Sequence, residues 1–244
     1  MGRKPVKKWM IGFWAIVMAL SLAGCGSQES GNTAMPSVPP SLENVTETKP
    51  VTEDGISVAT ESSAETDKIL IAYFTWAENA ADTSGVDATT SASVQVLGNV
   101  AQMAAWIQQE TGGDLFSIRV EEPYSAGYDE CLDRAADEKA ENARPVLVEK
   151  VLDMAGYDTV FLGFPNWWYS APMAVFSFLE ENDLSGKKVV LFCSHGTGGL
   201  ASSVKDISAV LPDSEIETNV LGVYRDDILE CQETINNWLE EIGY

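Results

Sequence analysis

The residues most able to bind a ligand fall mainly in two short stretches of this 244-residue chain, 163–172 and 194–199. The first reads Gly-Phe-Pro-Asn-Trp-Trp-Tyr-Ser-Ala-Pro, and its three consecutive aromatic side chains cannot all face a core. We expect at least one ring at a binding surface, where a flat aromatic ligand would stack on it. The alternative is that one tryptophan fills the seam between a helix and the sheet. The candidate binding residues here are Pro165, Asn166, Trp167, Trp168 and Tyr169.

The second stretch reads Ser-His-Gly-Thr-Gly-Gly, and its glycines let backbone amides approach a ligand closely. His195 is the only histidine of the chain, so no cluster of several histidines can hold a metal here. Its imidazole is expected either to be structural or to hydrogen-bond the ligand. The candidate residues are Ser194, His195, Gly196, Thr197, Gly198 and Gly199.

A third region combines two segments that suit a phosphate group. Thr75 and Trp76 lie at the end of a predicted strand, whereas Gly98 and Asn99 lie at the start of a predicted helix. A hydroxyl, small residues and an N-capping residue between a strand and a helix can cradle a phosphate. We therefore expect these four residues to contact an anionic ligand.

Alternating strands and helices must position these stretches. Continuous apolar runs predict strands at 68–75, 114–120, 159–164, 187–194 and 216–223. Helical spacing with glycine and proline boundaries predicts helices at 99–110, 129–143, 172–181, 200–211 and 226–242. The order predicts one three-layer α/β domain with a doubly wound, five-stranded parallel sheet over residues 68–244. In such sheets ligands bind beyond the carboxyl ends of the strands, where the candidate residues fall.

Several other chemistries find no support in the sequence. It has no Gly-x-Ser-x-Gly elbow, Walker lysine loop or His-Glu-x-x-His motif, which removes the common hydrolase and NTPase classes. The mixed charges of residues 129–144 indicate a solvated helix face rather than a site. Cys193 lies in a buried strand and is expected to be inert. Cys131 and Cys231 are expected on opposite faces of the sheet, where a disulfide could join them only if that topology were different.

The first 24 residues are predicted to be a signal segment. Basic residues among the first eight precede an apolar stretch, 9–23, that is shorter than the roughly 20 residues of a membrane-spanning helix. Residues 22–25 read Leu-Ala-Gly-Cys, which resembles the lipobox of bacterial lipoproteins and implies lipidation of Cys25. The alternative is an ordinary signal anchor with a chance cysteine. Lipidation would anchor the protein on the extracytoplasmic face of the cell membrane.

Charge and composition separate the remaining segments. Residues 26–67 contain no Phe, Trp or Tyr and are rich in Ser, Thr, Glu and Pro, which predicts a disordered tether after Cys25. The net charge of the chain is −22, from 37 acidic and 15 basic residues. Nucleic acid would be repelled by this charge, so none is expected as a partner, whereas proteins that are basic at the contact are favoured.

The motifs after the third and fourth predicted strands resemble those of bacterial flavodoxin-like proteins. These carry Gly-x-Pro-x-Trp-Trp after strand three and a His-Gly loop after strand four, as residues 163–168 and 195–199 do here. The segments 114–118, 122–124 and 183–187 also match, so the resemblance covers essentially all of residues 68–244. It implies the strand order 2-1-3-4-5 and a noncovalently bound FMN that transfers electrons.

The phosphate loop departs from the pattern of that family. Thr75 matches its first hydroxyl, but Ala77, Glu78 and Ala80 replace a second hydroxyl, a glycine and a threonine. Gly98, Asn99 and Val100 stand where a Gly-Asn-Thr is expected, so an insertion splits the loop. Hydroxyls within the insertion, among them Ser91, could restore the missing contacts. The alternative is a loop that no longer binds phosphate, since the charge of Glu78 would repel it.

Together the resemblance and the lipobox imply an FMN-binding electron-transfer protein tethered outside the cytoplasmic membrane. Its partners would be redox proteins that are basic at the contact, and no residue of the chain needs to act as acid or base. One alternative is an NAD(P)H-dependent FMN quinone reductase, which would need room for a second ring above the flavin. The other is a surface binding module that keeps the fold without the flavin.

Overall fold

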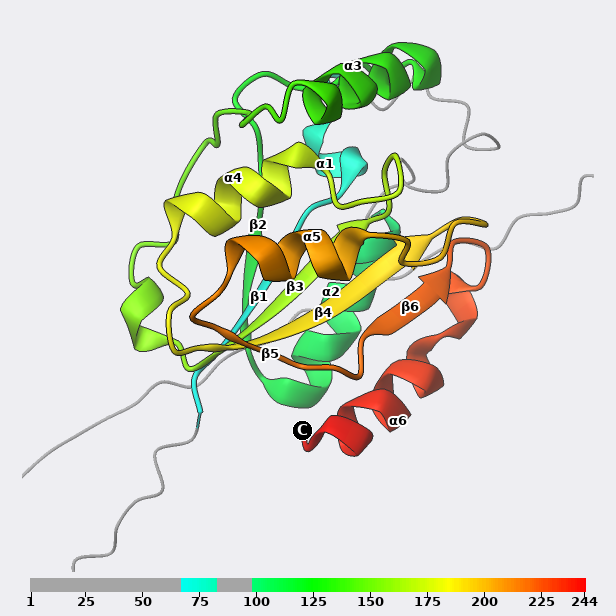
Figure 1. Ribbon diagram of the computed structural model, residues 1–244. Coiled ribbons are helices and arrows are strands. Elements are labelled where there is room, and N and C mark those ends of the chain that lie inside the picture. Colours follow the sequence, from blue (N-terminus) through cyan, green and yellow to red (C-terminus); the bar gives the residue numbers. More distant parts are fainter. Residues whose placement is uncertain (1–66, 83–97) are drawn as a thin grey trace, which may run out of the picture. The chain divides into compact units, whose positions relative to one another are not determined.

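The computed structural model describes residues 67–82 and 98–244 (Figure 1). The predicted signal segment, Cys25, the tether up to residue 66, and Ser91 lie outside these residues. In the described part of the chain, no helix is both long enough and apolar enough to cross a membrane.

A parallel sheet forms the middle layer. Its strands are β1 (Ile69–Tyr73), β2 (Asp114–Ser117), β3 (Thr159–Pro165), β4 (Lys188–His195), β5 (Glu215–Ile216) and β6 (Leu221–Tyr224). Their order is β2-β1-β3-β4-β5, which confirms the predicted order, and β6 also pairs with β4. Every residue of β1 and β3 is buried, as expected for continuous apolar strands covered on both faces.

The predicted fifth strand is in fact two strands. Val189 of β4 pairs with Ile216, and Phe192 pairs with Leu221. An advance of three residues along β4 therefore corresponds to an advance of five residues along the segment that forms β5 and β6. The two surplus residues leave the ladder between β5 and β6. The prediction of one strand over 216–223 was wrong because a run of suitable residues does not reveal an interruption in pairing.

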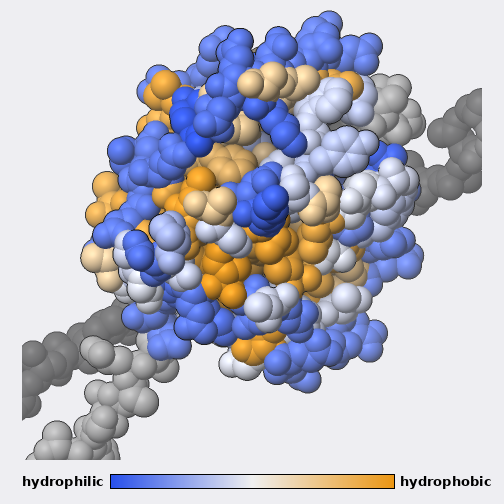
Figure 2. All heavy atoms as spheres, viewed as in Figure 1, coloured by the Kyte–Doolittle hydropathy of each residue, from blue (hydrophilic) through white to orange (hydrophobic). Residues whose placement is uncertain are grey.

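Helices cover both faces of the sheet (Figure 1). On one face lie α2 (Asn99–Thr111) and α6 (Gln232–Ile242), and on the other lie α3 (Tyr128–Ala140), α4 (Met173–Glu181) and α5 (Ser203–Val210). The short 3-10 helices are η2 (Met154–Gly156) and η3 (Ile228–Glu230), the latter within the predicted terminal helix. Figure 2 shows an apolar area in the middle of the face formed by α4 and α5, bordered by hydrophilic residues.

Each face has its own buried cluster. Cys131 belongs to the cluster under α3, α4 and α5, whereas Cys231 belongs to the one under α2 and α6. Both thiols are free, as is that of Cys193. The predicted placement of Cys131 and Cys231 on opposite faces is therefore confirmed.

Gly163 of β3 fixes how closely α2 approaches the sheet. A Cβ at this position would lie 2.2 Å from the Phe192 ring and 2.8 Å from Cγ1 of Val100, the second residue of α2. Both neighbours are fully buried and cannot move aside freely. The N-terminus of α2 is thereby held over the carboxyl end of β3.

We expect Gly163→Ala to lower the free energy of unfolding by about 1–3 kcal/mol, the usual cost of overpacking a tight core. Urea unfolding measures this change. A matched control is Gly196→Ala, since a Cβ there meets no atom within 4 Å and Gly196 has an ordinary φ. Equal stability of the Gly163→Ala variant and the wild type would contradict the close approach of α2.

Candidate functional site

A cavity of about 380 Å³ opens at the carboxyl edge of the sheet, beyond β3 and β4. This volume is within the usual range of small-molecule sites, and the position is the switch in strand order where such sheets bind ligands. Eleven of the predicted site residues line it: Trp76, Pro165, Asn166, Trp167, Trp168, Tyr169, Ser194, His195, Gly196, Thr197 and Gly198.

The other predicted residues that the structure describes lie next to this cavity rather than in its wall. Gly98 caps the N-terminus of α2, and Asn99 begins that helix. The carbonyl of Gly199 accepts a hydrogen bond from the Asn166 amide, which ties the loop after β3 to the loop after β4. Thr75 is 1% exposed and precedes α1 (Trp76–Asn79), a short helix that the sequence analysis did not predict.

A tight turn presents two aromatic rings at the rim of the cavity. The backbone amides and carbonyls of Trp167 and Ser170 exchange hydrogen bonds of 2.8 and 3.0 Å. Between them, Trp168 and Tyr169 have φ values of 48° and 65°. Positive φ at both central positions is typical of type I′ turns, where Asn and Gly are favoured and bulky side chains are strained. Strain of this kind is found mainly at functional sites, and here it leaves Tyr169 66% exposed.

Neighbouring elements hold this aromatic turn in place. From α3, the Lys139 ammonium donates to the carbonyl of Trp168, and the Trp168 indole donates to the carbonyl of Leu132 at 2.9 Å. From the other side, the Ser202 hydroxyl donates to the carbonyl of Tyr169 at 2.7 Å. The strained conformation is therefore fixed by contacts on both sides. The Trp168 ring takes part in them through its indole N–H, whereas Tyr169 takes part through its backbone carbonyl.

The Trp167 ring packs against the interior of the fold, unlike the rings of Trp168 and Tyr169. It packs edge to face against Phe74, Trp76 and Tyr124, with centroid distances of 5.4, 6.3 and 5.3 Å. These three neighbours are buried. The expectation that one of the two tryptophans fills a seam of the fold fits Trp167, and Trp168 and Tyr169 are the rings available to a ligand.

His195 is anchored against β6. Its Nδ1 is 2.8 Å from the carbonyl oxygen of Gly196, and its ring lies edge to face with Tyr224. A Cβ at Gly222 would lie 3.2 Å from Nε2, so the imidazole lies directly on the β6 backbone. These contacts favour a structural role for His195 over a hydrogen bond to the ligand. In the described part of the chain, no group of three or more His, Cys, Asp or Glu side chains could hold a metal ion.

The N-terminus of α2 lies beside the loop after β4. The Asn99 amide donates to the Ser194 hydroxyl at 3.1 Å and to the carbonyl of Arg225 at 3.3 Å. On the other side of β3, the buried hydroxyl of Thr75 has no hydrogen-bond partner. A buried polar group without a partner is rare and calls for an explanation such as a ligand. An unpaired hydroxyl and a helix N-terminus at one edge of the sheet fit a phosphate.

The carboxylate of Glu78 is bound at the carboxyl ends of β1 and β2. Its carboxylate accepts hydrogen bonds from the hydroxyls of Tyr73 and Ser117, which are paired residues of β1 and β2. Burial, and then the charge of Glu78, raise the pKa of Tyr73 to about 12, so this phenol remains a donor at neutral pH. The carboxylate is thereby held over the β1–β2 side of the sheet, whereas the cavity lies beyond β3 and β4. Two hydroxyl donors therefore already stabilise the negative charge of Glu78.

The inner face of α3 forms a wall of the cavity, so the interpretation of residues 129–144 as only a solvated face was wrong. The wall residues are Tyr128, Cys131, Leu132 and Ala135, and the apolar stripe at 131 and 135 is the signal that could have revealed them. Burial raises the pKa of the Cys131 thiol to about 12, which keeps it protonated and unreactive.

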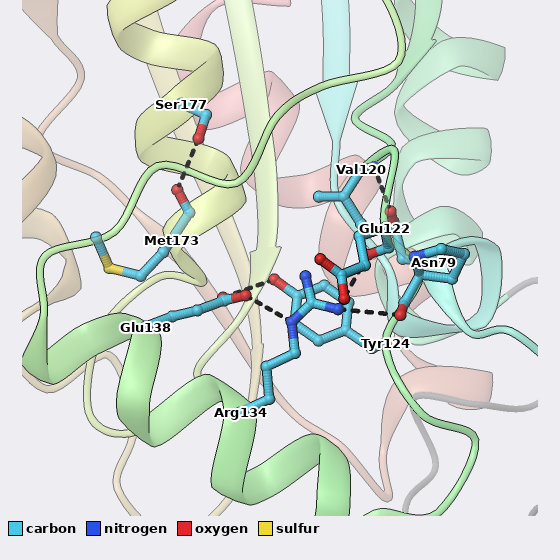
Figure 3. A network of polar contacts seen from close by, with 9 residues as sticks. Asn79, Val120, Glu122, Tyr124, Arg134, Glu138, Met173 and Ser177 are labelled. Carbon is cyan, nitrogen blue, oxygen red and sulfur yellow. Dashed lines mark hydrogen bonds and ion pairs between the residues drawn. The ribbon is translucent and has the colours of Figure 1, made fainter.

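A polar network fastens α3 to the segment that follows β2 (Figure 3). The Arg134 guanidinium donates to Glu138 at 2.8 Å and to the carbonyls of Glu122 and Pro123 at 3.0 Å. The Tyr124 hydroxyl donates to the other oxygen of Glu138 at 2.8 Å. Because the Tyr124 ring packs on Trp167, this network also supports the floor of the aromatic turn.

Comparisons with known proteins agree with this architecture. A family model described as flavodoxin matches residues 68–242, whereas no curated protein matches the chain. A putative flavoprotein from Bacteroides eggerthii DSM 20697 is 26% identical with a TM-score of 0.55 over 72% of this chain and 98% of its own. One from Bacteroides uniformis ATCC 8492 is 24% identical with a TM-score of 0.53 over 72% and 99%.

A third similar structure is a flavoprotein from Lactobacillus acidophilus NCFM, solved in complex with FMN. It is 21% identical with a TM-score of 0.48, over 70% of this chain and 98% of its own. The family match covers the whole sheet and every described residue that lines the cavity. The strand order, the position of the cavity and this match lead to one conclusion: the chain belongs to the flavodoxin family.

Proposed function

We propose that this protein binds FMN and transfers electrons, and that Cys25 tethers it to the outer side of the cytoplasmic membrane. The observation that carries the first part is the cavity at the switch point, where a strained turn presents the Trp168 and Tyr169 rings. A flat ligand that stacks on these rings would account for the strain.

The residues present fit the two ends of FMN, its isoalloxazine and its phosphate. The rings of Trp168 and Tyr169 suit the isoalloxazine, and the backbone of residues 196–198 offers hydrogen-bonding groups along the same wall. The unpaired Thr75 hydroxyl and the first residues of α2 suit the phosphate. Bound FMN would supply the redox chemistry itself, and the chain would supply binding, orientation and electrostatics.

The charge of the chain affects both the reduction potential of a bound flavin and the choice of partner proteins. A net charge of −22 disfavours added negative charge on a reduced flavin and so lowers its reduction potential. The same charge steers partners that are basic at the contact and makes their association sensitive to salt. Basic redox proteins are therefore the expected donors or acceptors.

The first test is the visible absorbance spectrum of the full chain, purified in mild detergent from cells supplied with FMN. Flavin bands that remain after gel filtration are the expected result. NADH or NADPH oxidation that depends on an added quinone would favour the quinone reductase over the electron carrier. A protein that stays colourless after FMN titration and desalting would contradict flavin binding and favour a surface binding module.

The membrane tether is tested separately. Cys25→Ser is expected to abolish incorporation of a labelled fatty acid and to move the protein out of the membrane fraction, because the thioether cannot form. Ser30→Ala, which leaves the cysteine intact, is the control. Membrane retention of the Cys25→Ser protein without its fatty acid would contradict lipid anchoring and favour an uncleaved signal anchor.

A further inference from the structure

The charge of the cavity is opposite to that of the protein. The chain carries 37 acidic and 15 basic residues, yet no Asp or Glu is among the described residues that line the cavity. Among those residues Arg225 alone carries a permanent charge. A single positive charge at the wall of a cavity in an acidic protein favours an anionic group of the ligand.

The backbone of Arg225 is fixed beside the N-terminus of α2. Its amide donates to the carbonyl of His195 at 2.8 Å, which continues the ladder between β6 and β4. Its carbonyl accepts from the Asn99 amide at 3.3 Å. The backbone of Arg225 therefore lies where the end of β4 meets the first residue of α2. Arg225 lines the cavity next to the helix terminus that attracts anions.

The guanidinium of Arg225 keeps most of its donors for a ligand. Among the described residues its one ion pair is with the adjacent Asp226, at 3.7 Å, and both side chains are about half exposed or more. Pairs of this kind are weak, because water screens them. A guanidinium has five N–H donors and can bind a phosphate through two of them.

The altered phosphate loop leaves a role for such a side chain. Ala77 and Glu78 lie in α1, where Glu78 is bound by Tyr73 and Ser117, and Val100 packs against Gly163. Of the hydroxyls that the family motif places there, only that of Thr75 remains within the described residues, and it is unpaired. The hydrogen-bond donors missing from this loop must come from elsewhere.

We propose that Arg225 binds the phosphate of FMN and so selects the phosphorylated flavin over riboflavin. This inference rests on the proposed FMN binding and assigns to Arg225 the hydrogen-bond donors that the altered loop lacks. Thr75, which follows β1, and the N-terminus of α2 bind the same phosphate. Because the guanidinium acts on the charge of the ligand, its removal affects FMN and not uncharged riboflavin.

The test compares dissociation constants for FMN and riboflavin, measured by fluorescence quenching on the full chain in detergent. Arg225→Gln is expected to weaken FMN binding tenfold or more, to leave riboflavin binding within twofold, and to reduce the salt dependence of FMN binding. Arg225→Lys should recover part of the loss. Arg119→Gln is the matched control, because it removes the same charge from a surface pair with Glu149 outside the cavity.

The outcomes separate the two proposals. If the wild-type protein prefers FMN and the Arg225→Gln variant keeps this preference, the role of Arg225 is overturned while FMN binding stands. Equal weakening of FMN and riboflavin would also overturn it, because it would show a packing effect. An Arg119→Gln variant that loses as much FMN affinity would show a general effect of charge. A wild-type protein that binds neither flavin would overturn both proposals.

Discussion

Replacing Asn79 with alanine is expected to lower the free energy of unfolding by about 3 kcal/mol or more. The Asn79 amide donates to the carbonyls of Thr75 and Ile118 at 2.9 and 3.0 Å, and its oxygen accepts from the amide of Val120 at 2.8 Å. The side chain is 3% exposed, so its loss would leave three backbone groups without partners away from water. Each such group costs about 1–3 kcal/mol. Chemical unfolding monitored by circular dichroism measures the change.

Asn237→Ala provides the matched control. Asn237 is exposed on α6, and the same substitution there should change stability by less than about 0.5 kcal/mol. Because Asn79 joins α1 to the segment that follows β2, its loss should also loosen the α1 end of the cavity. If both variants unfolded at the same denaturant concentration, the network around Asn79 would not be a main support of this edge of the sheet.

Replacing Tyr169 with glycine is expected to weaken FMN binding about tenfold while leaving stability within about 1 kcal/mol of the wild type. The ring is 66% exposed, and a Cβ at Gly198 would lie 3.4 Å from its Cδ1, so the ring stands against the loop after β4. Glycine accepts the positive φ of 65° without strain, which offsets its greater freedom in the unfolded chain. A lost aromatic contact of this kind is worth about 0.5–1.5 kcal/mol beyond its buried area. FMN titration and thermal unfolding of the same sample measure both quantities.

Tyr169→Phe is the control for this prediction. Phenylalanine keeps the ring and the strain but removes the hydroxyl, so FMN affinity should stay within about twofold if stacking is the main contribution. An equal loss in both variants would assign the effect to the hydroxyl instead. Unchanged FMN binding of the glycine variant would place the flavin away from the aromatic turn. Trp168 is less suitable for this test, because its indole also fastens the turn to α3.

Much of the fold could be predicted from the sequence because parallel strands covered on both faces are continuous apolar runs. The runs at 68–75, 159–164 and 187–194 correspond to β1, β3 and β4, and the order of the strands follows the family pattern. The split between β5 and β6 could not be predicted in the same way. It depends on two residues that fail to pair with β4, and composition carries no record of pairing.

The candidate site was predictable where its residues follow strand ends in the sequence. The segments 165–169 and 194–198 meet at one cavity because parallel strands bring their carboxyl ends to one edge. The wall formed by α3 was missed, since its charged residues outnumber the few apolar ones that face inward. Arg225 was missed because the sequence does not say that the segment after β6 returns to the N-terminus of α2.

The sequence by itself determined the α/β class, the order of its main elements, the family pattern and the residue types of both binding loops. Only the tertiary structure decided which aromatic side chain is buried and which is presented, because the choice depends on a turn with two positive φ values. It also decided that the Glu78 carboxylate lies over β1 and β2, and that a single arginine enters an otherwise uncharged wall. These features arise from contacts between residues far apart in the chain, and such contacts are set by packing rather than by local pattern.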